Sequence, residues 1–426
     1  MTAAAAPGTD AGTAPARSVR VLAAAQVLGG VGVASGIAVN GILAQDLSGS
    51  TSLSGLAQTM GVGGAAALAV PLARLAVRAG RRPALATGYA IGALGALLSL
   101  LAGAVRSFPL LLLGAALFGG GSAAGLQARY AAIDGVPPAR RGRALSLVVW
   151  ATTIGAVAGP NLSGPGATVG TALHLPPLVG PFVFALAGYL LAALGIWVLL
   201  RPDPLAAALA ARAVPAGALP EASHRGSTRR ALAVAVRSPD ALLGLVAVGI
   251  AHAVMVAVMV MTPVHMHDGG AVLTVVGIVI SAHIAGMYAA SPLWGWVADR
   301  FGRRTGIALG VAVLALACAL AASAPGDDPP RLGVALTLLG LGWSACVVSG
   351  STLLSESVPG EVRTSVQGLS DLVMGVVAAS AGAGAGPVME RLGYPALAVA
   401  AGALLTVVLV LLARRTGPRD PAVATA

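Results

Sequence analysis

Long apolar runs separated by short polar segments dominate the pattern of hydrophobic and polar positions along the chain. About 20 consecutive apolar residues form a helix long enough to cross the hydrocarbon core of a bilayer. The runs that meet this length are residues 20–44, 53–76, 83–105, 108–131, 144–166, 178–200, 241–263, 271–296, 305–324, 332–355, 368–389 and 395–413. The pattern therefore predicts an all-α polytopic membrane protein with twelve transmembrane helices.

A polar stretch that contains several arginines lies between the sixth and seventh runs and separates two six-helix halves. The first 16 residues are small and carry a single charge, at Asp10, so we expect no folded structure there. The predicted divisions are a disordered cytoplasmic tail at 1–18, an N-terminal half at 19–200, a cytoplasmic central loop at 201–239, a C-terminal half at 240–413 and a cytoplasmic tail at 414–426.

The composition supports a membrane protein and excludes other classes. Only 10% of the residues are charged and 57% are hydrophobic, whereas soluble domains contain about 25% charged residues. The formal net charge is +11, and all 26 basic residues are arginines. Because such residues mark cytoplasmic loops in membrane proteins, we expect a lipid bilayer and no nucleic acid as the partner of this charge. The sequence contains no nucleophile–base arrangement of catalytic type, so we expect no enzyme and no cofactor.

The arginines also predict an orientation. With the N-terminus inside, 22 of the 26 arginines fall on the cytoplasmic side, as the positive-inside rule requires. We therefore expect a multi-pass protein of the cell membrane with both termini in the cytoplasm. Arg129 falls within a span, where it either extends to the interface or contributes to gating or substrate contact. Asp371 is the one acid inside a predicted span. Polar residues of the spans that either line a cavity or bond between helices are Asn40, Gln127, Asn161 and Gln367.

The two predicted halves repeat one another. The segment VRAGRR at 77–82 matches DRFGRR at 299–304, with an offset of 222 residues between the central glycines. Val136-Pro137 matches Val358-Pro359 at the same offset, and GAVAGP at 155–160 matches GAGAGP further on. Duplicated helical halves around a midplane site are the architecture of secondary transporters.

The second copy of this loop resembles the signature loop of the major facilitator superfamily. The residues that carry the resemblance are Gly295, Asp299, Arg300, Gly302, Arg303 and Arg304. The resemblance implies the two-domain fold of that superfamily, a gating role for the loop and a monomer. The first copy has Val77 where the family has an aspartate, so we expect the first loop to lack the ion pair.

A second motif resembles the Gly-Pro-rich fifth helix of exporters in this superfamily. Its residues are Gly155, Gly159, Pro160 and Gly164. The alternative is that these glycines form only a helix-packing face beside a proline kink, which requires no role in export.

Soft metal ligands are concentrated between His252 and Met287. This window holds 9 of the chain's 15 methionines and histidines. Met255 and Met259 lie four residues apart on one predicted helix, as do His283 and Met287 on the next, so each pair shares a helix face. His252 lies on the face of the first pair. Thioethers and neutral imidazoles select Cu(I) over hard cations, although methionine also fills cores without binding anything.

These two motifs, Met-xxx-Met and His-xxx-Met, resemble those of the CcoA-like copper importers. The resemblance implies uptake of copper, as a transported ion and not as a cofactor, through a site made by Met255, Met259, His283 and Met287, with His252 as a further candidate. His265 and His267 fall in the predicted outer loop and are candidates for capturing the ion. Because relatives of this group include riboflavin carriers, a carrier of a small organic molecule, an exporter or a riboflavin-type importer, is the alternative.

Overall fold

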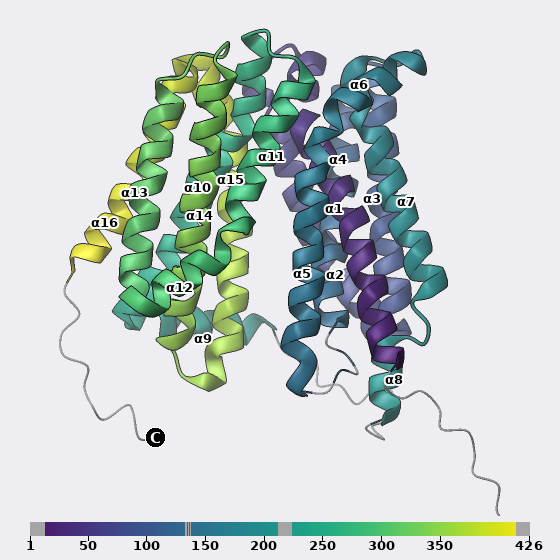
Figure 1. Cartoon of the computed structure of the whole chain (residues 1–426), viewed down its shortest axis with the longest axis vertical. Helices are drawn as coiled ribbons and strands as arrows, with labels where there is room; N and C mark the ends of the chain where they lie inside the picture. The colour runs from purple at the N-terminus through teal and green to yellow at the C-terminus, as the bar shows by residue number, and fades with distance from the viewer. Residues whose placement is uncertain (1–12, 133, 135, 137, 212–223, 415–426) are drawn as a thin grey trace, which may run out of the picture.

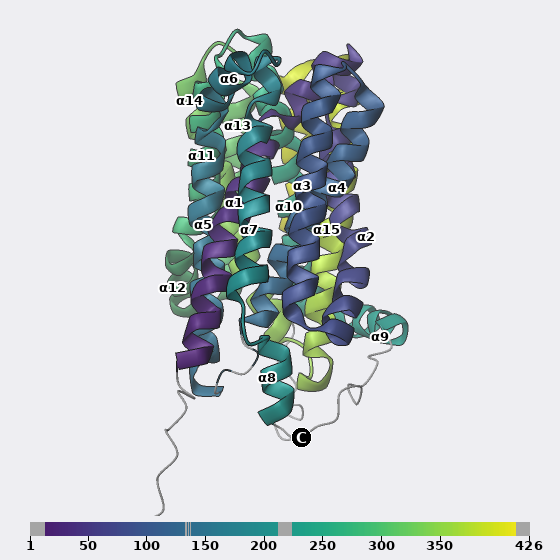
Figure 2. The ribbon, with the colours of Figure 1, turned by 90° about the vertical axis from the view of Figure 1, so that its right-hand side faces the viewer.

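The computed structural model describes residues 13–132, 134, 136, 138–211 and 224–414, and the regular elements in this part are all helices. Figures 1 and 2 show them as two upright bundles. The elements of the first bundle are α1 (Thr13–Ser48), η1 (Thr51–Leu53), α2 (Leu56–Ala79), α3 (Arg81–Ala104), α4 (Phe108–Ala131), α5 (Pro138–Asn161), α6 (Ser163–Ala172), η2 (Pro177–Val179) and α7 (Pro181–Leu199). The remaining elements are α8 (Pro204–Ala211), α9 (His224–Arg237), α10 (Pro239–Asp268), α11 (Leu273–Ala289), α12 (Ser291–Phe301), α13 (Arg303–Ala322), α14 (Pro329–Glu356), α15 (Gly360–Ala403) and α16 (Leu405–Ala413).

The spans agree with the predicted twelve-helix fold once two interruptions are considered. Ten stretches of the described chain are long and apolar enough to cross a membrane. The last of them, Ser365–Ala413, covers two predicted spans, because Gly393 breaks the helix with a φ of +82°. The predicted span 144–166, which is not among the ten, lies on α5 and α6, which are separated at Leu162. The all-α fold class is therefore confirmed.

Several boundaries differ from the prediction. The first helix begins at Thr13, inside the expected disordered tail, while residues 1–12 lie outside the described part. The central loop contains α8 and α9, and α9 packs Ala231 and Ala235 against the start of α15. The prediction ended the seventh span at residue 263, but α10 continues to Asp268. The hydropathy of a short window does not locate these helix ends, because a helix can continue past the apolar run where side chains and other helices cover it.

Several helix starts are set locally by a capping side chain followed by proline. Ser107 caps α4 by accepting from the backbone N–H of Leu110, and Ser238 caps α10 by accepting from that of Ala241. Asp328 does the same for α14. Proline suits the first turn, because its missing N–H would have no partner there.

Each bundle has its own core. In the N-terminal bundle Tyr189 lies 5.1 Å from Phe118 and 6.3 Å from Tyr89, measured between ring centroids, and all three rings are buried. The core of the C-terminal bundle is formed by α10, α11, α13, α14 and α15. The outer surfaces of α3 and α7 expose leucines such as Leu97 and Leu194. Exposed apolar rows of this kind are suited to contact with lipid.

The two ends of the molecule differ in charge. The basic end, at the bottom of Figure 1, holds α8, α9, α12 and the arginine-rich turns between α2 and α3 and between α12 and α13. The opposite end, at the top of Figure 1, holds α6 and the turn between α10 and α11. We use these two names below.

Hydrogen bonds join the two bundles toward the opposite end. The side chain of Gln45 donates to Asp268 over 3.2 Å, and that of Ser50 donates to Glu390 over 2.9 Å. Further down, the hydroxyl of Thr59 donates to a backbone carbonyl of α15 over 3.0 Å. These partners come from α1, η1 and α2 on one side and from α10 and α15 on the other.

Glycine also allows the two bundles to approach backbone to backbone toward the opposite end. We call this close contact between the bundles the seal. A Cβ atom on Gly55 would overlap the carbonyl of Gly382, and one on Gly277 would overlap the carbonyl of Pro160. Each of these pairs joins one bundle to the other. A larger residue at Gly55 or Gly277 therefore cannot be accommodated without moving the bundles apart.

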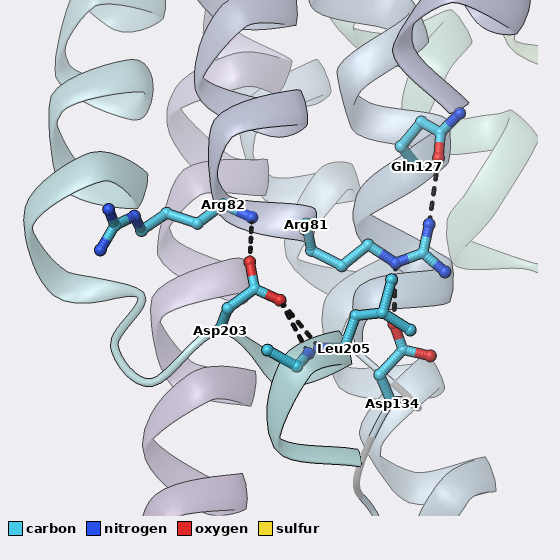
Figure 3. Close-up of polar contacts among 7 residues, drawn as sticks. Arg81, Arg82, Gln127, Asp134, Asp203 and Leu205 are labelled. Carbon is cyan, nitrogen blue, oxygen red and sulfur yellow. Dashed lines mark hydrogen bonds and ion pairs between the residues drawn. The ribbon is translucent and has the colours of Figure 1, made fainter. Parts of the chain in front are cut away.

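The repeated loops at the basic end carry equivalent ion pairs (Figure 3 shows the first). Arg81 lies 2.7 Å from Asp134, and Arg303 lies 3.0 Å from Glu356, with both residues of each pair offset by 222 from their counterparts. The first loop lacks the counterpart of the Arg303–Asp299 pair, because Val77 stands at that position. It nevertheless keeps the pair that corresponds to Arg303–Glu356, so it is not without an ion pair.

The rest of the signature loop ties helix ends together. Arg303 also bonds to Asp299 of its own turn, and Arg304 pairs with Asp240 at the start of α10 over 2.7 Å. Gly302 has a φ of +92°, which favours glycine, and Gly80 has +98° at the equivalent position. The other signature residues, Gly295 and Arg300, contribute less to packing: a Cβ on Gly295 would meet open space, and Arg300 is exposed.

We expect Gly55→Val to open the seal. In a Cys318→Ala, Cys346→Ala background, a cysteine placed at the buried position Ser54 should react with a membrane-impermeant maleimide several-fold faster when Gly55 is changed. Gly63→Val, where a side chain meets open space, is the matched control and should leave the rate unchanged. Equal rates in both variants would show that the glycine contact does not hold the bundles together.

We expect Asp134→Asn to destabilise the N-terminal bundle by about 1 kcal/mol, because the ion pair with Arg81 is only partly exposed. The exchange Arg81→Asp with Asp134→Arg should recover part of that loss. A double-mutant cycle on thermal unfolding measures the coupling, and a coupling energy of zero would contradict the pair.

Candidate functional site

The predicted soft ligands all lie on the C-terminal bundle, and four of them are in its core. Met255, Met259 and Met287 are buried, and His283 is fully buried. The helices α10 and α11 that carry them each pack extensively against α14 and make little contact with each other. The three thioethers thus belong to the core of the C-terminal bundle, and the imidazole of His283 is buried on a helix that packs against α14.

His283 has one ring nitrogen available. Its Nδ1 lies 2.7 Å from the backbone carbonyl of Leu336, which can only accept, so Nδ1 carries the proton. The other nitrogen, Nε2, is buried and has no hydrogen-bond partner in the described structure. A ring held at Nδ1 by a carbonyl, with the lone pair of Nε2 free, is the arrangement of metal-binding histidines.

His252 is engaged differently. Its Nδ1 accepts a hydrogen bond of 3.0 Å from the indole N–H of Trp343. A neutral ring that accepts at Nδ1 carries its proton on Nε2, so it has no lone pair left for a metal ion. His252 therefore differs from the other predicted ligands, because its ring is engaged as the hydrogen-bond acceptor of Trp343.

Met259 borders a small cavity between the two bundles. The cavity has a volume of about 10 Å³, enough for roughly one water molecule. Asn40 also lines the cavity, and its buried Oδ1 has no hydrogen-bond partner among the described residues. The lining residues are Ile37, Asn40, Gly41, Gln58, Met259, Val260, Pro263 and Ile280.

The two predicted capture residues lie in the last turn of α10 and not in a loop. His265 stacks on Tyr394 with 4.2 Å between ring centroids, and its Nε2 lies 3.2 Å from the carbonyl of Ala324. His267 is exposed. Residues two apart on a helix point to nearly opposite sides, so His265 and His267 do not form a common binding pair in this structure.

The fifth-helix motif acts in packing. Side chains on Gly155 or Gly159 would overlap the backbone of α1, and the hydroxyl of Ser35 donates to the carbonyl of Gly159 over 3.0 Å. Pro160 and Gly164 face the other bundle, where Gly277 and the start of α11 approach them. This geometry agrees with the packing alternative and places the motif at the seal between the bundles.

The other polar residues of the spans have different roles. Asn40 lines the small cavity, as one alternative proposed. The remaining three form hydrogen bonds to another side chain: Gln127 with Arg81, Asn161 with Ser281 and Gln367 with Ser355.

A second group of residues, only part of which the sequence indicated, lies where the bundles face each other below the seal. Arg129 on α4 interacts electrostatically with Asp371 on α15 and with Tyr288 on α11, in the other bundle. No ion pair within 4 Å joins Arg129 to either residue in the described chain. Asp371 is exposed, and Tyr288 is 39% exposed. The charge of Arg129 therefore acts on two exposed groups of the other bundle.

An aromatic surface adjoins these charges. The ring of Tyr288 meets that of Trp343 edge to face, with 6.1 Å between centroids. Trp343 is nearly buried and is held by its hydrogen bond to His252. Tyr288 and Trp343 could not be singled out from the sequence, since single aromatic residues in apolar runs are common. Arg129 and Asp371 were both visible in the sequence, because Asp371 is the one acid inside a predicted span and Arg129 also falls within one.

Comparisons with known proteins agree with this architecture. The family model of the Major Facilitator Superfamily matches residues 20–271 and again residues 245–426. The chain is 36% identical over 391 residues to the uncharacterized MFS-type transporter YdeG of Bacillus subtilis, covering 91% of this chain and 89% of the relative. It is also 28% identical over 415 residues to the riboflavin transporter RfnT of Brucella anthropi, covering 97% and 99%.

Solved structures show the same fold. A mutant of the nucleoside transporter NupG has a TM-score of 0.72 at 15% identity, covering 93% of this chain and 98% of that one. A bacterial homolog of the human lysosomal transporter Spinster has a TM-score of 0.67 at 16% identity, covering 94% and 95%. With two family matches that each cover one of its repeated bundles, a shared fold and relatives along nearly its full length, the chain belongs to the major facilitator superfamily and is a multi-pass membrane transporter.

Proposed function

We propose that the protein carries a small organic molecule across the cell membrane by alternating access. The observation that carries this proposal is the set of Arg129, Asp371 and Tyr288. Arg129 of the N-terminal bundle acts electrostatically on Asp371 and Tyr288 of the C-terminal bundle, and a cargo that binds these groups would contact both moving parts. The relative that is named as a riboflavin transporter supports an organic cargo.

The orientation follows from the arginines. The basic end faces the cytoplasm, because basic turns are retained on that side during insertion. The seal then lies on the outer side, and the conformation described is accessible from the cytoplasm. We further propose that the protein acts as a monomer, since each chain contains both bundles of the alternating-access unit, and that it catalyses no covalent reaction.

Import of copper is the second candidate, and the free Nε2 of His283 favours it. Met287 lies one turn further along α11, and Met255 and Met259 belong to the same core cluster. Neutral ligands of this kind bind Cu(I) without a buried negative charge. The burial of the cluster means that the ion reaches it only if α10, α11 or α14 moves, whereas the charged group is already accessible.

We expect Arg129→Gln to abolish transport of the organic cargo. In cells that express wild type, Arg129→Gln or Arg391→Gln, untargeted mass spectrometry should find at least one organic solute whose level changes several-fold with wild type and with Arg391→Gln. Arg129→Gln should leave that solute at the level of cells without the protein. Arg391 is an exposed arginine of α15 and serves as the control. The absence of any changed organic solute would overturn the proposal.

Copper accumulation tests the second candidate. If the soft ligands carry copper, His283→Gln and Met255→Leu should each reduce accumulation by about tenfold, because each removes one ligand of a transient site. Met266→Leu, which removes an equally buried thioether of α10 outside the predicted set, should retain it. Equal copper in all strains, measured by elemental mass spectrometry, would eliminate the copper candidate and leave the organic one standing.

A further inference from the structure

The helix α9 is attached to the C-terminal bundle by one face. It contacts α15 and α10, and Ala231 and Ala235 are fully buried in a small apolar cluster that also contains Leu245 and Val362. Residues four apart share a helix face, so the two alanines define the face that meets the protein. Figure 2 shows α9 projecting from the side of the molecule near the basic end.

Three arginines occupy the outer side of this helix. Arg229, Arg230 and Arg237 are exposed, and none of them has a carboxylate partner within 4 Å in the described part of the chain. At about 100° per residue, they are turned by roughly 100° to 160° away from Ala231. The arginines therefore form a cationic face that the described chain leaves without a counter-charge.

An exposed apolar strip lies beside the arginines. Leu232 is 46% exposed and Val236 is 54% exposed, and their spacing of four residues puts both on one side of the helix. By the same geometry the strip falls between the buried alanine face and Arg229. A helix that carries an apolar strip next to a basic face is the kind that lies at the boundary between the headgroups and the acyl chains of a membrane.

We propose that α9 binds anionic phospholipids. The guanidinium groups of Arg229, Arg230 and Arg237 bind lipid phosphates, and Leu232 and Val236 enter the boundary between headgroups and acyl chains. This inference goes beyond the proposed function, because it assigns a partner to a surface that is separate from the cargo residues, and it holds for any cargo.

The charge and the position of α9 favour this partner. A guanidinium forms paired hydrogen bonds to a phosphate, and an anionic leaflet attracts basic segments that lie against it, whereas a zwitterionic leaflet has no net charge to do so. The apolar cluster joins α9 to the first turns of α10 and α15. Because those two helices enter the bilayer there, the headgroup layer lies at the level of α9.

The test places a fluorescent label on the arginine face of the full-length protein. Cys318→Ala and Cys346→Ala remove both cysteines of the chain, and Ala233→Cys provides one exposed position for a nitrobenzoxadiazole label. The labelled protein is placed in nanodiscs of phosphatidylcholine, or of phosphatidylcholine with about one third phosphatidylglycerol. Both kinds contain the same small fraction of phosphatidylcholine with a nitroxide on its headgroup, and quenching of the label measures its contact with the headgroup layer.

We expect at least about twofold stronger quenching in the nanodiscs with phosphatidylglycerol, because the arginines draw α9 onto the anionic surface. Salt at about 1 M should remove the difference, since it shortens the screening length to about 3 Å. The combined replacement of the three arginines should remove the difference as well: Arg229→Gln, Arg230→Gln and Arg237→Gln.

A matched control deletes the same number of charges elsewhere at the basic end. Arg17→Gln, Arg20→Gln and Arg78→Gln replace three exposed arginines of α1 and α2, and this variant should keep the difference between the two lipids. Leu232→Ser with Val236→Ser should lower the quenching in phosphatidylglycerol by about half, because the apolar strip no longer enters the membrane.

Equal quenching of the wild-type helix in the two lipids would overturn the proposal and would leave the cationic face to a soluble acidic partner. If the control variant loses the difference as well, the effect comes from net charge and the assignment to α9 is wrong. Unchanged quenching in the variant with two serines would overturn the insertion of the apolar strip. The cell assay for organic solutes does not depend on any of these results, so the proposed function stands or fails separately.

Discussion

The two bundles approach each other most closely at their opposite end, through backbone contacts and hydrogen bonds. Gly55 and Gly277 let backbone meet backbone there, and polar pairs such as Ser50 with Glu390 add hydrogen bonds. Away from this contact, residues of the C-terminal bundle such as Tyr288 and Asp371 remain exposed. A carrier needs this difference between a closed end and an accessible region, and here it arises from the absence of side chains at a few positions.

The two bundles move as units only if each is rigid, and the repeated ion pairs provide part of that rigidity. Arg81 with Asp134 and Arg303 with Glu356 fix the same turn in each bundle. The N-terminal copy shows that duplicated domains can lose one partner of a motif, at Val77, and retain the electrostatic function through another acid. The two loops therefore differ in sequence, but each keeps an ion pair at the same turn.

Two kinds of chemistry coexist in the protein, at different depths of burial. The thioethers and the imidazole of His283 are enclosed in the C-terminal core, where they stabilise packing and have no route to solvent in this conformation. Asp371 is exposed and Arg129 is partly buried, and the two belong to different bundles. A cargo bound by the first set would contact one bundle, whereas a cargo bound by the second set would contact both. This difference is the physical reason to favour the second set.

Hydropathy, arginine placement and the 222-residue repeat determined the class, the twelve spans and the duplication, because these depend on the length of a bilayer and on local composition. The sequence alone also showed the four-residue spacing of Met255 with Met259 and of His283 with Met287, which places each pair on one helix face. The sequence could not show what each ring nitrogen bonds to, that His265 and His267 point apart, or that Tyr288 packs against Trp343. Those facts depend on how α10 and α11 pack against α14, and residues far apart in the sequence meet only through that packing.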